Sequence, residues 1–293
     1  MVAVSGGVDS MVLLDILATA PPRRGYALVV AHFDHAMRPE SADDAVFVAE
    51  AARGYGAKFV SARSTRKLTS EADARTSRHG FFMDVLQVHP GHQLVLGHHQ
   101  DDLIETSLLN LTRGTGWEGL APFSKSDIVR PLLPVSRTQI VAYAKHHHLW
   151  WHEDPTNANL SNPRNFLRHE LLVKADKTWR QRYLKLISEV SEAGNAARVI
   201  VGSIGRFENN SWTASRIAIM ALTLSELEEI IVTKSKALEP SIELDQRLVK
   251  ELAVFVKTGN PGKHRPVRAG LKLAIGRKEI CLSLAINAQK AVK

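Results

Sequence analysis

The stretch VAVSGGVDSMVLL, residues 2–14, places a turn of small residues between two apolar runs at the start of the chain. The first run predicts a short buried strand over residues 2–4, and the second predicts a helix over residues 8–18. Gly6 and Gly7 have no side chain that blocks an approaching anion, and the new helix offers free N–H groups and the positive end of its dipole. We therefore expect a phosphate site formed by Ser5, Gly6, Gly7, Val8, Asp9 and Ser10.

The turn differs from the pattern GxxxxGK(S/T), in which a lysine reaches the β- and γ-phosphates of a nucleotide. No lysine ends the turn here, which argues against transfer of the γ-phosphoryl group. A site built from amides and hydroxyls alone suits pyrophosphate as a leaving group. Two adjacent glycines are also typical of an ordinary strand-to-helix turn, which is the alternative to a phosphate site.

The composition is typical of a globular chain that buries a large core. The chain has 293 residues, of which 44% are hydrophobic and 23% charged, so we expect one large domain or two smaller ones. Cys281 is the only cysteine, which excludes an internal disulfide, a CxxC pair and a cysteine-ligated iron–sulfur cluster. No apolar run approaches the roughly 18 residues of a membrane-spanning helix, and no secretion signal is visible. We expect a cytoplasmic protein without membrane contact, and a few residues preceding the very short first strand.

The net charge of +8 is concentrated near the C-terminal end. Residues 244–293 hold eleven lysines and arginines and three acidic residues, a balance of +8, whereas residues 1–243 hold 27 of each kind. The basic residues alternate with apolar ones such as Val267, Leu271 and Leu273, as in a folded surface. Such a surface favours a nucleic acid or another polyanion, and ordinary solvated surface is the alternative.

Apolar strands alternate with helices over residues 1–112. Strands are predicted over residues 2–4, 26–33, 58–62 and 93–97, and helices over 8–18, 41–53, 71–88 and 101–111, with Ser41 as a helix cap. Four such repeats imply an α/β fold with a doubly wound parallel sheet, in which ligands bind beyond the carboxyl ends of the strands.

The rest of the chain predicts a second, smaller domain. Helices are expected over residues 136–147, 165–172, 179–204, 224–231 and 245–256, and a strand pair over 267–275 and 279–285. A boundary near residue 200, with a margin of about 15 residues, gives a catalytic domain over residues 1–200 and a small basic α+β domain over residues 201–293.

Two predicted strand ends carry acidic and imidazole side chains. The second strand ends in HFDH, residues 32–35, and the fourth ends in GHHQDD, residues 97–102, which continues to Glu105. In a helix that begins near Asp101, Asp102 and Glu105 share one face, and Asp34 comes from a neighbouring strand end. We expect a pocket of carboxylates beside the phosphate turn, which needs either Mg²⁺ or a cationic substrate.

Two alternatives apply to these carboxylates. Asp101 and Asp102 are also typical of residues that offset a helix dipole, although this does not explain Asp34 or the paired histidines. A two-metal phosphoesterase would also place His and Asp at several strand ends, but the phosphate turn on the first strand argues against it.

Six motifs in order resemble a known family. SGGVDS, HFDHAMRPES, GHHQDDLIET, RGTGWEGL, RPLL and HEDPTN…RNFLRHELL cover about residues 4–172. Together they are similar to the bacterial tRNA(Ile)-lysidine synthetases, which are PP-loop ATP pyrophosphatases. The chain departs from that pattern at Leu103, where the family commonly has glutamine, and its C-terminal part matches only loosely.

This resemblance implies a ligation that uses ATP with Mg²⁺. The wobble cytidine in the CAU anticodon of an isoleucine tRNA is first adenylated at its C2 oxygen, which releases diphosphate. Free L-lysine then attacks C2, and AMP leaves. Backbone amides of the turn, with the Ser5 and Ser10 hydroxyls, would hold the leaving diphosphate.

The resemblance also implies roles for individual side chains. The carboxylates are expected to bind Mg²⁺, to hold the lysine ammonium and to take its proton. These roles fall to Asp34, Asp102 and Glu105, with Mg²⁺ on Asp34 and Asp102. Arg113 offsets phosphate charge, or is only a charge at the C-terminal end of its helix. Contact with tRNA or the adenylate is implied for Arg164, Asn165 and Arg168, and ordinary surface charge is their alternative.

We expect the basic domain to bind tRNA phosphates through Arg265, Arg268 and Lys272. Arg268 and Lys272 should share one face of the strand over residues 267–275, opposite Leu271 and Leu273. A PP-loop tRNA thiolase is one alternative. Such an enzyme needs cysteine sulfur chemistry or a cluster, and Cys281 alone is a poor candidate for either. A non-catalytic RNA-binding protein is another, against which the intact SGGVDS turn argues. The oligomeric state is open, with a homodimer as one option.

Overall fold

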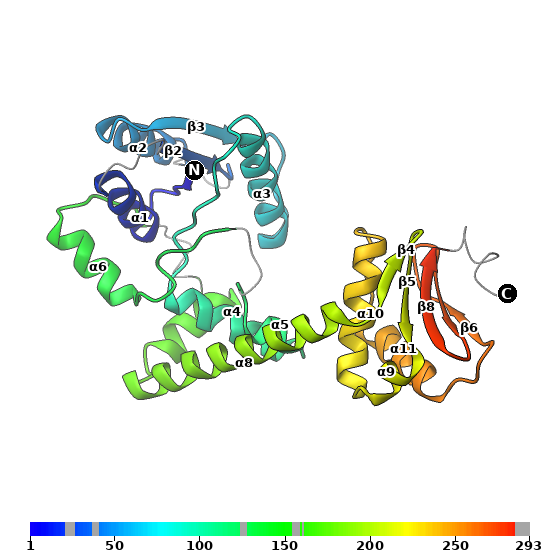
Figure 1. The fold of residues 1–293 in the computed structure, drawn as a ribbon. Helices are drawn as coiled ribbons and strands as arrows, with labels where there is room; N and C mark the ends of the chain where they lie inside the picture. Colours follow the sequence, from blue (N-terminus) through cyan, green and yellow to red (C-terminus); the bar gives the residue numbers. More distant parts are fainter. Residues whose placement is uncertain (21–26, 37–40, 124–127, 154–158, 160, 285–293) are drawn as a thin grey trace. The chain divides into compact units, whose positions relative to one another are not determined.

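The computed structural model describes residues 1–20, 27–36, 41–123, 128–153, 159 and 161–284. The chain divides into two compact units, Met1–Ser191 and Glu192–Lys293 (Figure 1). Parts of two predicted motifs, at residues 37–40 and 154–158, lie outside the described residues. No helix in these ranges is long and apolar enough to cross a lipid bilayer.

The first unit is built on a parallel sheet. Its strands β1 (Val2–Ala3), β2 (Val29–Asp34) and β3 (Lys58–Arg63) lie in the order β1-β2-β3. The predicted strand over residues 93–97 is reduced to Val95, which bridges Val2 on one side and Val129 on the other, both in parallel. Within the described part of the first unit the regular strands are therefore three rather than four, and single bridges extend the sheet beyond β1.

The direction of strand order reverses at β1. The chain proceeds outward from β1 to β2 and β3, then crosses back to place Val95 on the other side of β1. In doubly wound sheets the ligand crevice opens at this reversal, beyond the carboxyl ends of the strands. The predicted phosphate turn follows β1, and the predicted histidines follow Val95, so both lie at this point.

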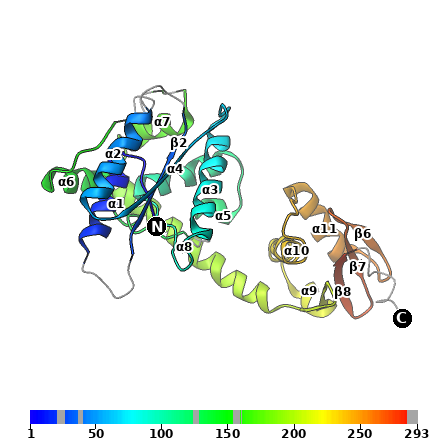
Figure 2. The ribbon, with the colours of Figure 1, turned by 90° about the horizontal axis from the view of Figure 1, so that it is seen from above.

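Helices cover both faces of the sheet (Figure 2). One face packs against α1 (Val8–Thr19), α2 (Ser41–Gly54) and α6 (Arg137–His146), and the other packs against α3 (Glu71–Gln87). The doubly wound α/β prediction is confirmed. Ser41 was expected to cap α2, but it is the first helical residue, and its hydroxyl is buried without a hydrogen-bond partner in the part of the chain that is described.

The remaining elements of the first unit carry the acidic and basic motifs. They are α4 (Gln100–Thr112), α5 (Trp117–Leu120), α7 (Pro163–Phe166), the π-helical turn η2 (Leu167–Leu172) and α8 (Lys177–Ser203), which continues into the second unit. The predicted helix over residues 165–172 is thus a short α-helix followed by a π turn. It starts early because Asn162 caps it and Pro163 occupies its first position.

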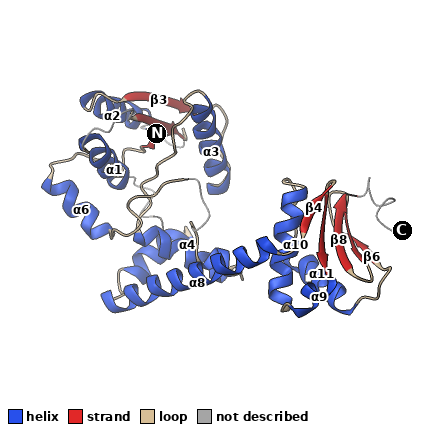
Figure 3. Ribbon diagram, in the orientation of Figure 1, coloured by secondary structure: helices blue, strands red, loops and turns tan. Residues whose placement is uncertain are grey.

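The second unit is an antiparallel sheet with helices on one face (Figure 3). The strands lie in the order β4-β5-β8-β7-β6, and Leu273, Leu282 and Trp212 form its core with Ile230 and Leu252 of the helices. Its elements are β4 (Arg206–Glu208), β5 (Ser211–Ser215), α9 (Arg216–Ala221), α10 (Leu224–Leu238), α11 (Gln246–Thr258), β6 (His264–Pro266), β7 (Leu271–Ile275) and β8 (Glu279–Leu284). The predicted strand pair is confirmed, although β7 begins at Leu271 rather than at residue 267.

Gly97 generates a first prediction, because it packs directly on the phosphate turn. A Cβ at Gly97 would lie 3.1 Å from the Asp9 carbonyl oxygen and 3.4 Å from the Ser10 Cα. We expect Gly97→Ala to displace the turn and weaken nucleotide binding by about tenfold. Gly80→Ala is the matched control, since a Cβ there meets open space within α3 and should leave the affinity unchanged. Titration with ATP measures both, and equal affinities would contradict the prediction.

Candidate active site

The phosphate turn is held in shape by its own hydroxyls. Gly6 adopts φ +94°, a conformation that L side chains rarely tolerate, and Gly7 is the residue that precedes α1. The Ser10 hydroxyl donates to the Gly7 carbonyl at 2.9 Å and accepts from the Ser5 amide at 3.1 Å. The Gly7 N–H donates to the Ser5 hydroxyl at 3.4 Å, so the amides of Ser5 and Gly7 both take part in holding the turn.

Three backbone N–H groups of this turn remain open. Those of Gly6, Val8 and Asp9 donate to no atom within the described ranges. Val8 and Asp9 begin α1, so their N–H groups lie at the positive end of its dipole. These open amides are compatible with the expected phosphate site, which stays a prediction.

A distant segment supports the turn from outside. The His152 backbone N–H donates to the Gly6 carbonyl at 2.9 Å. The His152 ring lies 2.7 Å from Asp44 and stacks on Phe47, with ring centroids 4.4 Å apart. The sequence did not reveal this support, because a backbone hydrogen bond leaves no side-chain pattern.

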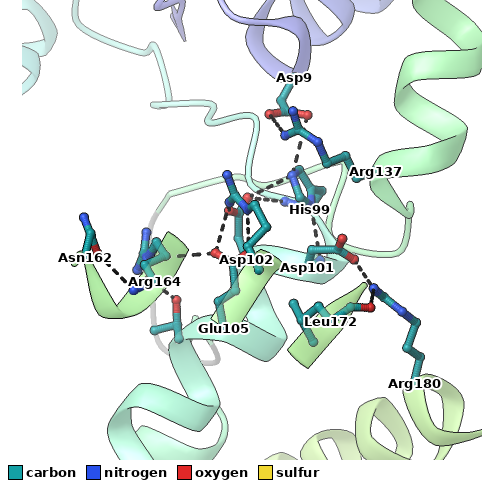
Figure 4. A network of polar contacts seen from close by, with 12 residues as sticks. Asp9, His99, Asp101, Asp102, Glu105, Arg137, Asn162, Arg164, Leu172 and Arg180 are labelled. Atoms are coloured by element: carbon teal, nitrogen blue, oxygen red, sulfur yellow. Dashed lines mark hydrogen bonds and ion pairs between the residues drawn. The ribbon is translucent and has the colours of Figure 1, made fainter. Parts of the chain in front are cut away.

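His99 connects the phosphate turn to α4 (Figure 4). Its Nδ1 accepts the Asp101 N–H at 3.1 Å and thereby caps the helix. Nε2 carries the proton of the neutral ring and lies 3.5 Å from both Asp9 Oδ1 and Asp102 Oδ2. Burial lowers the pKa of His99, but Asp9 and Asp102 outweigh it and the net shift is upward.

Asp9 is more than an exposed turn residue. Its second oxygen lies 3.4 Å from Arg137 Nη1. Burial raises the pKa of Asp9, but His99, Arg137 and Arg168 outweigh this effect and hold the pKa below its ordinary value. Asp9 is therefore a carboxylate at neutral pH that joins the turn to α4 and α6.

Asp102 and Glu105 share one guanidinium. Arg168 Nε donates to Glu105 Oε1 at 2.8 Å, and its Nη2 donates to Glu105 Oε2 at 3.0 Å and to Asp102 Oδ1 at 3.4 Å. Burial raises the pKa of Glu105, an effect that Arg168 opposes only in part. The predicted helical pair is confirmed as a neighbouring pair, and we refer to Asp102 and Glu105 as the acidic pair.

Asp34 does not join the acidic pair. Its Oδ1 accepts the Ala36 N–H at 2.7 Å, and its Oδ2 lies 3.3 Å from Arg63 Nε. The strand order separates β2 from the Val95 segment by β1, about 10 Å for two strand spacings. No group of three or more potential metal ligands occurs among the residues described, so the Mg²⁺ site expected on Asp34 and Asp102, which would include the ATP phosphates, stays a prediction.

Arg113 also lies away from the acidic pair, and Asn165 makes a hydrogen bond outside this pair. Arg113 is exposed at the C-terminal end of α4, roughly 16 Å along the helix from Asp102. Asn165 is buried and donates to the Asn159 carbonyl at 3.0 Å. By contrast, Arg164 donates to Thr106 at 3.3 Å, beside the acidic pair. Of the predicted RNFLR contacts, Arg164 and Arg168 therefore belong to the site.

Two arginines at the site were not predicted. Arg180 Nη1 lies 2.7 Å from Asp101 Oδ1, and its Nη2 donates to the Leu172 carbonyl at 2.6 Å (Figure 4). Arg137 pairs with Asp9 from the first position of α6, where a cation opposes the helix dipole. That unfavourable placement is the sequence signal that marks Arg137.

His98 lies in a stack beside the acidic residues. Its ring is parallel to Phe123 at a centroid distance of 5.0 Å, and Arg130 Nε donates to its Nδ1 at 3.0 Å. Burial lowers the pKa of His98 to about 4, and Arg130 contributes in the same direction. The ring is therefore neutral at physiological pH and carries its proton on Nε2.

The predicted basic surface of the second unit is partly neutralised. Arg265 pairs with Glu251 at 2.6 Å, and Arg268 pairs with Asp245 at 2.5 Å. Lys272 lies on β7 opposite Ser283, on the face that excludes the core leucines. The expectation that Arg268 and Lys272 share a strand face is wrong, because Arg268 precedes β7 in a turn.

The thiol required by the thiolase alternative is poorly suited to sulfur chemistry. Cys281 is half-buried in β8, and burial raises the pKa of its thiol. A reactive cysteine needs a lowered pKa, so the surroundings of Cys281 do not favour this alternative.

The fold and the phosphate turn define a class of nucleotide-using proteins, and comparison with known families agrees. A family model described as a PP-loop domain matches residues 1–175. The chain belongs to this family. Membership implies the use of ATP.

Curated relatives carry a more particular name. The tRNA(Ile)-lysidine synthase of Exiguobacterium sibiricum is 42% identical over 182 residues, which are 59% of this chain and 42% of the relative. The enzyme of the same name from Vibrio cholerae is 38% identical over 196 residues, 61% of this chain and 42% of the relative. The chain thus matches less than half of the length of these relatives.

A solved structure shares the fold. The U34-tRNA thiolase NcsA from Methanococcus maripaludis, solved with its 4Fe–4S cluster, has a TM-score of 0.51 and 15% identity. The likeness covers 65% of this chain and 71% of the thiolase chain. At this identity the likeness shows the fold alone.

Asp9 yields a pH-dependent prediction. Because its pKa is depressed in the folded state, the paired carboxylate stabilises the fold at neutral pH, and this contribution disappears as the pH falls through the folded pKa. Asp9→Asn should lower the free energy of unfolding by about 1–3 kcal/mol at pH 7, with the difference shrinking below about pH 4. Urea unfolding of the wild type and of Asp9→Asn from pH 7 to below about pH 4 measures this difference in the free energy of unfolding. Exposed Asp43→Asn is the control, and a constant difference at all pH values would refute the assignment.

Proposed function

We propose that this chain ligates lysine to C2 of the wobble cytidine in the CAU anticodon of an isoleucine tRNA. The observation that carries the proposal is the coupling of an open phosphate turn to the acidic pair through His99. The phosphate turn suits a leaving diphosphate, and the acidic pair suits an amine. The names of the curated relatives support the same reading.

In the first step the cytosine C2 oxygen attacks the α-phosphate of ATP, and diphosphate leaves. Charge develops on the leaving oxygens, and the open N–H groups of Gly6, Val8 and Asp9 are arranged to receive it. The Ser5 and Ser10 hydroxyls hold the turn in this shape. Little reorganisation is then required when the bond breaks.

In the second step the lysine ε-amine attacks C2, the C2–O bond breaks and AMP leaves. Lysine arrives as an ammonium, which the acidic pair attracts, and it must lose a proton before it attacks. Burial raises the pKa of Glu105, which makes this carboxylate a better proton acceptor than an exposed one. We assign Glu105 as the base and Asp102 as the group that orients the ammonium.

Mg²⁺ enters the proposal only as the partner of the ATP phosphates. The described carboxylates do not form a cage for it, since Asp34 faces Arg63 and Asp102 faces Arg168. Mg²⁺ commonly retains waters and takes few protein ligands when phosphates are present. No step above depends on its position.

The proposal extends to partners and location. We assign the second unit to tRNA binding and the first to catalysis, in the cytoplasm, where ATP, lysine and tRNA are available together. A homodimer is compatible with this assignment.

In the described part of the second unit, the cations without an ion-pair partner include Lys272, Arg277 and Lys278, and these are the preferred phosphate contacts.

The activity is tested with ATP, labelled L-lysine and an anticodon stem-loop that carries CAU. We expect diphosphate release that requires the RNA, followed by incorporation of lysine and not of glutamine. Glu105→Gln should retain diphosphate release and reduce incorporation by at least about 100-fold. Transfer of sulfur or ammonia, or diphosphate release without RNA, would refute the proposal.

The docking surface is tested through salt dependence. Alanine at Lys272, Arg277 and Lys278 should reduce the log–log slope of tRNA affinity against salt by roughly 0.7 to 0.9 per lost contact. The matched control replaces Arg206, Arg265 and Arg268, which already pair with acidic residues and should change the slope less. Equal slopes for the first variant and the wild type would place tRNA docking elsewhere.

A further inference from the structure

The acidic pair already holds a cation supplied by the chain. The planar guanidinium of Arg168 contacts both oxygens of Glu105, at 2.8 and 3.0 Å, and one oxygen of Asp102, at 3.4 Å. The Glu105 side chain is 0% exposed and that of Arg168 is 20% exposed. Such a two-pronged, shielded contact is the strongest form of arginine–carboxylate pairing.

We propose that Arg168 is an internal occupant of the ammonium site, so that a substrate amine must displace its guanidinium. The identity of the amine as lysine rests on the proposed function. The competition itself rests on the contacts, because an ammonium that binds between Asp102 and Glu105 requires the oxygens that Arg168 now uses. Arg164 Nε also lies 4.0 Å from Glu105 Oε2, so an ammonium that entered beside Arg168 would be a third cation at these oxygens and would be strongly repelled.

The backbone around Arg168 provides a means of release. Arg168 lies in η2, a π-helical turn that directly follows the four-residue helix α7. Single π turns are rare, are frequently found at functional sites and differ from an α-helix by one residue of hydrogen-bond register. A change to α-helical register rotates the side chain about the helix axis, which withdraws the guanidinium from the acidic pair.

The charges around Glu105 determine how strongly the acidic pair binds an ammonium at each pH once Arg168 has left. Burial and Asp102 raise the pKa of Glu105, whereas Arg168 and Arg164 lower it. Loss of Arg168 therefore raises the pKa of Glu105 further, so a smaller fraction of Glu105 is ionised at a given pH than in the wild type. An arriving ammonium must expel the proton from the fraction that is not ionised, so its affinity for the vacated site increases with pH.

The test measures lysine binding to the full chain by calorimetry, without ATP or tRNA. Arg168→Gln removes the occupant, and we expect its Kd for L-lysine to be at least about tenfold lower than that of the wild type. A pocket that is open about one tenth of the time loses this factor in apparent affinity. The affinity of the variant should also increase with pH, because Glu105 must be ionised to bind an ammonium. Equal or weaker binding than by the wild type would overturn the proposal.

Two further variants separate occupancy from a structural effect. Arg66→Gln breaks a comparable two-pronged pair with Asp73 in the same unit and should leave lysine affinity unchanged. Arg168→Lys retains a cation, so its lysine affinity should fall between those of the wild type and Arg168→Gln. Free guanidinium should compete with lysine for Arg168→Gln, and absence of competition would also overturn the proposal.

The outcomes distinguish this proposal from the proposed function. Tighter lysine binding by Arg168→Gln, without lysidine formation by the wild type, would refute the proposed function alone. Lysidine formation by the wild type, with unchanged lysine affinity in Arg168→Gln, would refute internal occupancy alone.

Discussion

The arrangement of the candidate site depends on one buried imidazole. His99 caps α4 through Nδ1 and faces Asp9 and Asp102 through Nε2. A buried polar cluster of this kind is stable only when its members remain together, because each would otherwise lose its counterpart in a region of low dielectric. The phosphate turn and the first turn of α4 are consequently linked through His99, although more than 80 residues of sequence separate them.

The local parts of this arrangement follow from sequence. Small residues after an apolar strand predict the open turn, and helical spacing places Asp102 and Glu105 together, because both depend on neighbours within a few residues. The position of Asp34 depends instead on strand order, which periodicity does not encode. Likewise, the motif that contains Arg168 was recognised, but its contact with Glu105 joins residues 63 apart in the sequence and required the structure.

In the second unit, too, the ion pairs of charged side chains could not be predicted from the sequence. The basic excess near the C-terminus was evident from composition, but Arg265 and Arg268 prove to pair with Glu251 and Asp245 on or beside α11. Charge counting finds cations and does not find their partners. The strands β4 and β6 were also missed, since each has three residues and a mixed composition that gives no alternating pattern.

The hydrogen bond from His152 to Gly6 has a consequence for the order of folding. The first ten residues contain every group of the phosphate turn, yet the Gly6 carbonyl is held by a residue that is synthesised when most of the PP-loop domain is complete. A chain that is synthesised from its N-terminus therefore lacks this support for the Gly6 carbonyl until His152 has been added. In such a nascent chain the Gly6 carbonyl gains its His152 partner only after most of the PP-loop domain has been synthesised, so the finished nucleotide site depends on a contact between residues that are distant in the sequence.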